Sequence, residues 1–450
     1  MSFIRRRYYI WLIKEYVKRW NKTIISSIII GVGAFFVAAF IISIYVSPLI
    51  GKNVKKIGYV GSYTILSLPY EILSDVSYGL TKINDDGTVA PAASYKWDVR
   101  DNGKEYIFFI KRGQYFHDKK ELKSDTIELK FKDVEKKNLD EYSISLKLKE
   151  PYAPFLSSVS LPIFGKNFTG LGEYKVKKVD INAGFIKSIV LNNKKSRELR
   201  KIINFYPTQD ALKTAYLLGE IDQAIGIRSL NLEGTNIESF TNTNISKKVN
   251  YKELVVLFYN NVDSILSNKK IRQALNYAIP KTFEEGERAY SPIPPHSIYF
   301  SKTLNYGFSD VAIARDLIET ERDTLSNKTI VISAPFEYED VASRIASSWK
   351  QIGVETEIKT TADLPATFQI LIYPIKLPID PDQYVLWHSS QLSNIARYKN
   401  LRIDKLLEDG RLTYDPEQRK SIYADFQKYI IDDIPASFLY FPYEYTIQRK

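Results

Sequence analysis

The sequence predicts an α/β protein of two lobes that follows a single membrane-spanning helix. Three observations support this prediction. Residues 24–46 are almost wholly apolar, residues 254–279 combine a buried strand with an amphipathic helix, and residues 329–375 alternate between strand and helix patterns. With 450 residues the chain also exceeds the usual size of one domain, so each lobe is long enough to bury a core of its own.

The expected membrane span covers residues 23–50, a stretch that contains no charged side chain. The 23 residues of its apolar part, 24–46, reach roughly 34 Å as a helix, which is enough for a hydrocarbon layer of about 30 Å. A cleaved secretory signal is the competing interpretation, but its apolar region would be shorter and would end in small residues. We therefore expect a helix that stays attached.

Basic residues on either side of this stretch predict its orientation. Seven precede it, and only Lys52, Lys55 and Lys56 follow closely. By the positive-inside bias, residues 1–22 form a cytoplasmic basic tail and the chain beyond about residue 52 is extracytoplasmic, so the protein is expected to be single-pass in the cell membrane. The tail carries six of the eleven net positive charges. Because a basic strip beside a span usually meets anionic lipid, no nucleic-acid partner is expected.

The apolar run 254–259 is the central element of the sequence. It predicts a buried strand, which ends at the turn residues Asn260 and Asn261. A helix then begins, with Ser267 as the expected N-cap. Its apolar residues recur with helical spacing and form one face: Ile271, Ala274, Leu275, Ala278 and Ile279. On composition alone, such a unit is ordinary in an α/β sheet.

The remaining elements follow from periodicity and turn residues. In the first part of the chain we expect strands at 57–60, 144–149 and 202–206, and helices at 70–80 and 208–218. In the second part we expect strands at 329–333, 354–358, 368–375 and 437–441, and a helix at 340–352. A further helix begins at Asp415 and Pro416, which suit the N-cap and the first helical position.

Several stretches resemble, in order and in spacing, the motifs of one family. They include Asp86-Gly87-Thr88-Val89-Ala90-Pro91, Tyr95-Lys96-Trp97-Asp98-Val99, Phe116-His117-Asp118, Gly219-Glu220-Ile221-Asp222, Ile271-Arg272-Gln273-Ala274-Leu275-Asn276-Tyr277-Ala278 and Asp380-Pro381-Asp382. The set resembles the extracytoplasmic solute-binding proteins of family 5, the substrate-binding proteins of peptide, nickel and oligopeptide ABC transporters. The resemblance extends from about residue 54 to about residue 445.

This resemblance implies a periplasmic-binding-protein-like fold of class II, cluster C type. Lobe I would comprise residues 54–253 and 438–450 and lobe II residues 254–437, with two crossings that permit closure about a hinge. The chain departs from the family in two places. Only sixteen residues separate Asp125 from Tyr142, so the outer subdomain is expected to be trimmed, and the family's Gly-Thr-Gly-Pro-Tyr turn is altered at residues 169–174.

The same resemblance implies a protein that captures a peptide-like or other small solute in the cleft between its lobes and delivers it to an ABC transporter permease. The sequence shows no catalytic set, because it lacks cysteine and its three histidines share no metal-ligand spacing. We therefore expect no enzyme activity, cofactor or metal. Two alternatives stay open: a tethered sensor or assembly protein that has lost transport, and an anchored extracytoplasmic hydrolase, which would need reactive groups that are not visible.

The residues expected to line the cleft come from both lobes and the crossing: Tyr63, Leu66, Ser67, Leu68, Asn260, Asn261, Tyr373, Asp380, Trp387, Asn394 and Arg397. Core packing explains Tyr373 and Trp387 equally well, and helix capping or a surface turn is a ready alternative for Asp380.

One family position bears on the chemistry of the solute. In peptide-binding members, an aspartate three positions before the Asp-Pro pair holds the α-ammonium of the peptide, and Leu377 occupies that position here. A buried ammonium without a carboxylate costs roughly several kcal/mol. Peptides with a free amine are therefore expected to bind weakly unless Asp380 or another acid substitutes.

Overall fold

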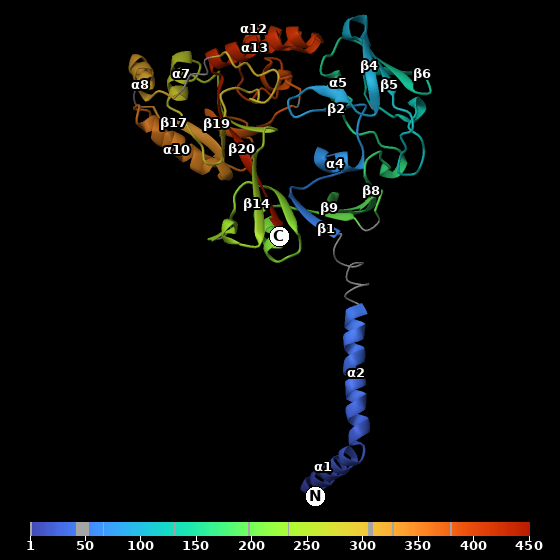
Figure 1. Ribbon diagram of the computed structural model, residues 1–450. Coiled ribbons are helices and arrows are strands. Elements are labelled where there is room, and N and C mark those ends of the chain that lie inside the picture. Colours follow the sequence, from blue (N-terminus) through green and yellow to red (C-terminus); the bar gives the residue numbers. More distant parts are fainter. Residues whose placement is uncertain are drawn as a thin grey trace.

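The computed structural model describes residues 2–41, 54–65, 67–129, 131–196, 199–232, 234–304, 309–325, 328–378 and 380–450. It shows a broad α/β body from which α1 (Ser2–Arg19) and α2 (Asn21–Ile41) project (Figure 1). The predicted membrane span is described only in part, because residues 42–50 lie outside this set. No helix within the described ranges is both long enough and apolar enough to cross a membrane.

One large mixed sheet forms the backbone of the body. Its described strands run in the order β18-β17-β19-β15-β20-β11-β1-β10-β9-β8, and β14 and β16 pair with β20. The bounds of these strands are β1 (Val54–Val60), β8 (Tyr174–Asn182), β9 (Phe185–Asn193), β10 (Arg200–Tyr206), β11 (Gln223–Ile227), β14 (Thr243–Val249), β15 (Glu253–Tyr259), β16 (Gly286–Arg288), β17 (Ile330–Pro335), β18 (Thr356–Thr361), β19 (Ile370–Lys376) and β20 (Ala436–Arg449).

The long strand β20 takes part in both halves of this sheet. Its beginning pairs antiparallel with β15, from Ala436 opposite Phe258 to Tyr440 opposite Val255. Its end pairs with β11 and β14, and Arg449 lies opposite Thr243. We call β15, β17, β18 and β19 with their helices the second-lobe half, and β1, β8, β9, β10 and β11 with theirs the first-lobe half. The residue ranges given above for the two lobes stay a prediction.

Helices cover both faces of the second-lobe half, which explains why every residue from Leu254 to Tyr259 is buried. On one face lie α7 (Lys269–Tyr277), α8 (Val311–Thr320) and α10 (Glu339–Lys350), and on the other α12 (Leu401–Leu412) and α13 (Pro416–Asp433). The predicted buried strand and its helix are both present. Asn268 caps α7 in place of Ser267, because its side-chain oxygen accepts a hydrogen bond from the Lys270 N–H at 2.9 Å.

Within the described residues, one helix covers each face of the first-lobe half. The side chains of Ile72 and Val76 on α4 (Tyr70–Val76) pack against β9 and β10. On the other face α6 (Gln209–Leu217) contacts β11 and the end of β20, and Thr208 caps it as predicted. Shorter elements complete the body: α5 (Phe155–Ser158), α9 (Arg322–Leu325), α11 (Tyr384–Trp387), β2 (Thr81–Ile83), β3 (Val89–Pro91), β12 (Asn231–Leu232), β13 (Thr235–Asn236) and the 3₁₀ turn η6 (Phe336–Tyr338).

A separate antiparallel sheet lies beside the first-lobe half, in the order β4 (Ser94–Arg100), β5 (Glu105–Ile110), β7 (Ser143–Leu148) and β6 (Val134–Asp140). Its buried side chains, which include Phe108 and Ile144, pack with Phe155 of α5. In the described chain between β5 and β6 there is one 3₁₀ turn, η3 (Ser124–Thr126), and no α-helix. This arrangement agrees with the expected trimming of the outer subdomain, which stays a prediction.

His117 connects this small sheet to the altered turn at residues 169–174. The Gly170 N–H donates to Nδ1 of His117 at 3.1 Å, so Nε2 carries the proton and donates to the Gly172 carbonyl at 3.0 Å. The turn needs glycine because a Cβ on Gly170 would lie 2.0 Å from the carbonyl oxygen of Val76. His117 is therefore a structural residue, which holds the turn against the end of α4 through these two hydrogen bonds.

A β-bulge interrupts β20 where it leaves the second-lobe half. Val255 lies opposite Tyr440 and Val256 opposite Phe438, so Leu439 has no partner on β15. The guanidinium of Arg288 fills the gap: its Nη1 donates to the Leu439 carbonyl at 2.8 Å and also contacts the Phe438 carbonyl. Burial lowers the pKa of Arg288 to about 10, which leaves it charged at neutral pH. A charged donor thus stabilises the backbone of the crossing strand.

Replacing Arg288 by Gln should lower the free energy of unfolding by about 2–3 kcal/mol, because the carbonyl groups of Phe438 and Leu439 lose a charged donor. Urea unfolding followed by circular dichroism measures the change. Arg315→Gln is the matched control: this exposed guanidinium donates to the Gln351 carbonyl at 3.2 Å, and its loss should change stability by less than about 0.5 kcal/mol. Equal stabilities of the two variants would refute the role assigned to Arg288.

Candidate functional site

The topology of the large sheet directs two sets of strand ends toward each other. In the second-lobe half, β17, β18 and β19 run parallel to one another. In the first-lobe half, β1, β10 and β11 also run parallel to one another, but in the opposite direction, and β15 and β20 lie between the two sets. Because β20 passes from the second-lobe half into the first, the carboxyl ends of both sets face the region of the crossing (Figure 1). Ligands of open α/β sheets bind outside the carboxyl ends of the strands. We call this region the interlobe junction.

Arg228 lies at the junction, directly after β11. Its Nη2 donates to both carboxylate oxygens of Glu253, at 2.7 and 2.6 Å, and its Nη1 donates to the Tyr338 hydroxyl at 3.3 Å. Burial alone would lower the pKa of Arg228, but the charge of Glu253 outweighs it and raises the pKa. Glu253 begins the crossing strand and Tyr338 follows β17, so one guanidinium joins the first-lobe half, the crossing and the second-lobe half.

Further contacts connect the two sides of the molecule. Lys252 at the crossing forms an ion pair with Glu71 on α4, and its carbonyl accepts a hydrogen bond from the Leu377 N–H at 2.9 Å. Farther from the crossing, the Ile298 N–H donates to the Asp86 carbonyl at 3.0 Å and the Ala153 N–H donates to the Arg411 carbonyl at 2.7 Å. The second-lobe half therefore touches the segment that carries the small sheet as well as the first-lobe half.

The residues expected from the first lobe lie just after β1. The Tyr63 hydroxyl donates to the Val60 carbonyl at 2.8 Å, and its ring packs 5.1 Å from that of Phe205. Ser67 belongs to an exposed turn in which its hydroxyl accepts a hydrogen bond from the Thr64 N–H at 2.8 Å. Leu68 is partly buried, and Leu66 lies outside the described residues.

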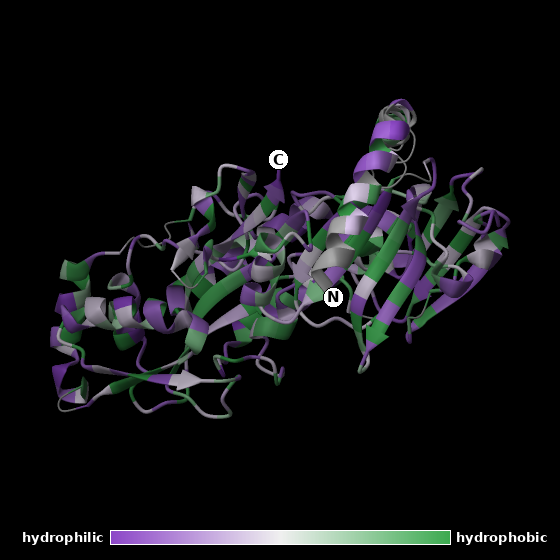
Figure 2. Cartoon of the chain, turned by 90° about the horizontal axis from the view of Figure 1, so that it is seen from below, coloured by the Kyte–Doolittle hydropathy of each residue, from purple (hydrophilic) through white to green (hydrophobic). Residues whose placement is uncertain are grey.

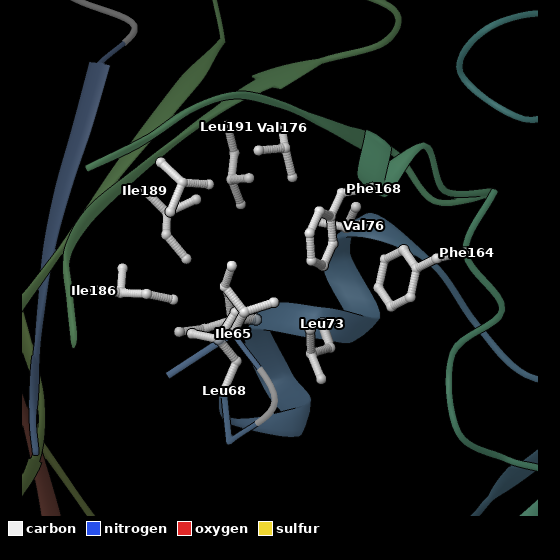
Figure 3. Close-up of a pocket in the computed structure, with 12 residues that line it drawn as sticks. Ile65, Leu68, Leu73, Val76, Phe164, Phe168, Val176, Ile186, Ile189 and Leu191 are labelled. Carbon is white, nitrogen blue, oxygen red and sulfur yellow. The ribbon is translucent and has the colours of Figure 1, made fainter. Parts of the chain in front are cut away.

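Leu68 takes part in an apolar pocket of the first-lobe half (Figure 3). The pocket encloses about 400 Å³, including space open to solvent, between α4, the hairpin β8–β9 and the loop before β8. All its lining residues are apolar: Ile65, Leu68, Ile72, Leu73, Val76, Phe164, Phe168, Val176, Val179, Ile186, Ile189 and Leu191. It is formed within one half of the sheet, not between the halves, and it offers no polar group that could orient a solute.

Asn260, Asn261 and Arg397 come together at the end of β15, where their side chains bind backbone carbonyl groups. Asn260 Nδ2 donates to Phe368 at 2.9 Å. Asn261 Nδ2 donates to the carbonyls of Tyr259, Ala396 and Pro435 at 2.9–3.2 Å, and Arg397 Nη2 donates to that of Ala366 at 2.8 Å. These side chains fasten loops to the strand, and the amides of the two asparagines are occupied in doing so.

Tyr373, Trp387 and Asn394 belong to the packing of the second-lobe half. Trp387 is buried between the rings of Phe258 and Phe438, at 6.0 and 5.8 Å, while Tyr373 on β19 packs against the same cluster. Asn394 is buried, and its Nδ2 donates to the Tyr398 carbonyl at 2.8 Å.

Asp380 forms a two-pronged ion pair with Arg419 on α13. The Nη1–Oδ2 and Nη2–Oδ1 distances are 2.8 and 2.5 Å, and the two side chains are only 4% (Arg419) and 12% (Asp380) exposed. Burial would lower the pKa of Arg419, but the hydrogen bonds and charge of Asp380 raise it. Both carboxylate oxygens of Asp380 are therefore engaged, and the ion pair holds the Asp-Pro turn on α13.

The structure thus brings the expected residues together in separate groups. Tyr63, Ser67 and Leu68 lie near α4, while the two asparagines and Arg397 lie at the end of β15. Sequence reasoning missed Arg228 and Tyr338. Their positions in the sequence could have indicated them, because each follows shortly after a strand of the sheet, and ligands of open α/β sheets bind at the carboxyl ends of the strands.

The described residues contain no group of three or more His, Cys, Asp or Glu side chains that could hold a metal ion. His388 hydrogen bonds with the Ser390 hydroxyl at 2.8 Å and lies 3.4 Å from Glu408, and the His296 ring packs at a tilt 4.4 Å from that of Tyr251. These contacts explain both histidines without a reactive role.

The ion pair of Asp380 predicts a structural effect of its removal. Asp380→Asn should lower the free energy of unfolding by about 3–5 kcal/mol, because it leaves the Arg419 charge buried without its partner. Asp425→Asn, on the exposed side of α13, is the control and should stay within about 0.5 kcal/mol of the parent. Thermal and urea unfolding report both values. An Asp380→Asn protein of undiminished stability would contradict the structural role.

Comparison with known proteins agrees with this architecture. The model of the bacterial extracellular solute-binding proteins, family 5 Middle, matches residues 88–373. The oligopeptide-binding protein AppA of Bacillus subtilis is 25% identical over 440 residues, which cover 81% of this chain and 80% of the relative.

Solved structures share the fold. The ABC transporter substrate-binding protein CtaP of Listeria monocytogenes has a TM-score of 0.75 and 20% identity, covering 88% of this chain and 94% of that one. NikZ of Campylobacter jejuni, solved in complex with Ni(L-His), has a TM-score of 0.70 and 21% identity with the same coverage. The matched family consists of substrate-binding proteins that do not catalyse a reaction. This chain belongs to the bacterial extracellular solute-binding proteins of family 5.

Proposed function

We propose that this protein captures a peptide-like solute at the interlobe junction and delivers it to an ABC transporter permease. The observation that carries the proposal is the meeting of the carboxyl ends of β1, β10 and β11 with those of β17, β18 and β19. AppA, an oligopeptide-binding protein, supports peptides as the solute class. Family membership supports delivery to a transporter.

Closure about the crossing would enclose the solute. We propose lobe I as residues 54–253 with 438–450, and lobe II as residues 254–437. Only β20 and the link from β14 to β15 would then need to bend, since these two segments carry the chain between the halves. Hinge motions of this kind concentrate the change of dihedral angles in a few residues, so neither core has to open.

A membrane tether would keep the binder beside its permease. We propose that residues 23–50 hold the protein in the cell membrane, with residues 1–22 in the cytoplasm and the rest outside. The support is the uncharged stretch and the excess of basic residues before it. Tethering raises the effective concentration of the binder at the permease without any new contact.

The chemistry of the junction bears on the kind of peptide. Leu377, at the position where peptide-binding relatives place an aspartate, is buried in the apolar core of the second-lobe half, and Asp380 is engaged with Arg419. Neither position offers a free carboxylate to an α-ammonium. The solute is therefore proposed to be bound chiefly through its backbone and side chains, with no strong requirement for a free amine.

Calorimetry on the detergent-solubilised full chain tests this function, with a pentapeptide, its N-acetylated twin and nickel–histidine as ligands. The N-acetylated peptide should bind, and the free-amine peptide should bind at least about tenfold more weakly, because its buried ammonium finds no free carboxylate at Leu377 or Asp380. Recovery of intact peptide after incubation checks that none is hydrolysed.

Three results would contradict the proposal. They are no heat with either peptide, a binding preference for nickel–histidine alone, and cleavage of the bound peptide. A preference of more than tenfold for the free amine would retain peptide capture but overturn the assignment of its chemistry.

A further inference from the structure

Helix α1 exposes a continuous apolar stripe. Tyr8, Leu12, Tyr16 and Trp20 follow one another at intervals of four residues, so they lie along one side of a helix. Their side chains are between 41% and 60% exposed. The ring of Tyr16 lies 6.4 Å from that of Trp20, and the Trp20 N–H donates to the Tyr16 carbonyl at 3.0 Å, so the stripe reaches the end of the helix. Apolar surface of this extent marks a site of interaction.

The opposite side of α1 carries positive charge together with exposed apolar side chains, those of Ile10, Trp11 and Val17. Lys14 and Lys18 are one turn apart and exposed, and Trp11 lies beside them, three residues before Lys14. Trp11 and Trp20 are nine residues apart, which is two and a half turns, so their side chains point to opposite sides of the helix. Glu15 is the one acidic residue of this segment, which also contains Arg5, Arg6, Arg7 and Arg19 in its sequence.

The direction of α1 matters as much as its composition. At Trp20 the chain bends between α1 and α2. Figure 2, seen from below, shows α1 running across the view while α2 is seen nearly end-on. If α2 stands along the membrane normal, α1 therefore lies along the membrane surface. Exposed tyrosine and tryptophan side chains with lysines nearby suit that position.

We propose that α1 lies in the anionic headgroup layer of the membrane, with Tyr8, Leu12, Tyr16 and Trp20 directed toward the acyl chains and Lys14 and Lys18 toward lipid phosphates. Tyrosine and tryptophan are the side chains that favour this layer, because they are apolar with one polar end. Lysine near an anionic surface adds attraction. This inference rests on the proposed membrane tether and goes beyond it, since a tether alone leaves the tail free in water.

Tryptophan fluorescence of the full chain in vesicles tests the proposal. Trp11 and Trp20 are compared through the variants Trp20→Phe and Trp11→Phe, and the double variant supplies the background from Trp97, Trp349 and Trp387. Vesicles of phosphatidylcholine and phosphatidylglycerol contain lipid brominated close to the headgroup or near the chain end. Iodide in the water provides the opposite quencher, and flotation shows whether the protein is attached at all.

Trp20 should be quenched by the lipid brominated close to the headgroup, at a depth of about 5–10 Å, and should be protected from iodide. Trp11, whose ring lies 6.3 Å from that of Tyr8, should be quenched less than Trp20 by this lipid and more than Trp20 by iodide. In vesicles that contain phosphatidylcholine without phosphatidylglycerol, brominated lipid should quench Trp20 less. Lys14→Gln with Lys18→Gln should weaken that dependence on lipid charge while flotation persists.

Each of the following outcomes would overturn the inference. Flotation with Trp11 and Trp20 equally open to iodide would show a tethered protein with its tail in water. Flotation with Trp20 shielded from both quenchers would show that a second copy or another protein covers the stripe. Loss of flotation would contradict the proposed membrane tether and, with it, the inference. Flotation therefore distinguishes failure of the proposed anchoring from failure of the proposal for α1. A double lysine variant that keeps the full dependence on lipid charge would refute the role of the phosphates.

Discussion

The hydrogen bonding of one strand, β20, constrains the whole structure. Its fourteen residues must pair with β15 at one end and with β11 and β14 at the other. A strand shared in this way joins the two halves of the large sheet into one sheet. It also explains the bulge at Leu439, where β20 changes partners, and the buried guanidinium of Arg288 that binds the Phe438 and Leu439 carbonyl groups there.

That same strand decides where a solute can be held. The parallel strands on either side run in opposite directions because three successive antiparallel pairings, β19 with β15, β15 with β20 and β20 with β11, separate them. Their carboxyl ends therefore meet at the junction, where Arg228, Glu253 and Tyr338 already connect the halves. The apolar pocket near α4 lies outside this arrangement, since it belongs to the core of the first-lobe half. Its lack of polar groups fits incomplete packing better than recognition of a peptide.

Periodicity and motif order predicted much of the fold. The buried strand 254–259, the helix capped by Thr208 and the helix that begins after Asp415 are all present, because each depends on local patterns of apolar residues and caps. Side-chain partners were harder to predict. Asp380 and Arg419 are 39 residues apart, and nothing in the sequence reveals that they meet. Asn261 looked like a free turn residue, yet its amide binds carbonyls of residues 135 and 174 positions away. Such contacts depend on the tertiary fold, which local patterns do not contain.

The way in which β1 enters the body has a mechanical consequence. The chain passes from the N-terminal helices into β1, which is paired along its length with β10, through seven residue pairs, and with β11, through three. A pull on the N-terminal segment acts along the axis of β1 and loads these hydrogen bonds together, in shear. Bonds loaded together resist force better than bonds that open one after another from an edge strand. The body would therefore keep its fold under drag or collision while it is held by its N-terminal end.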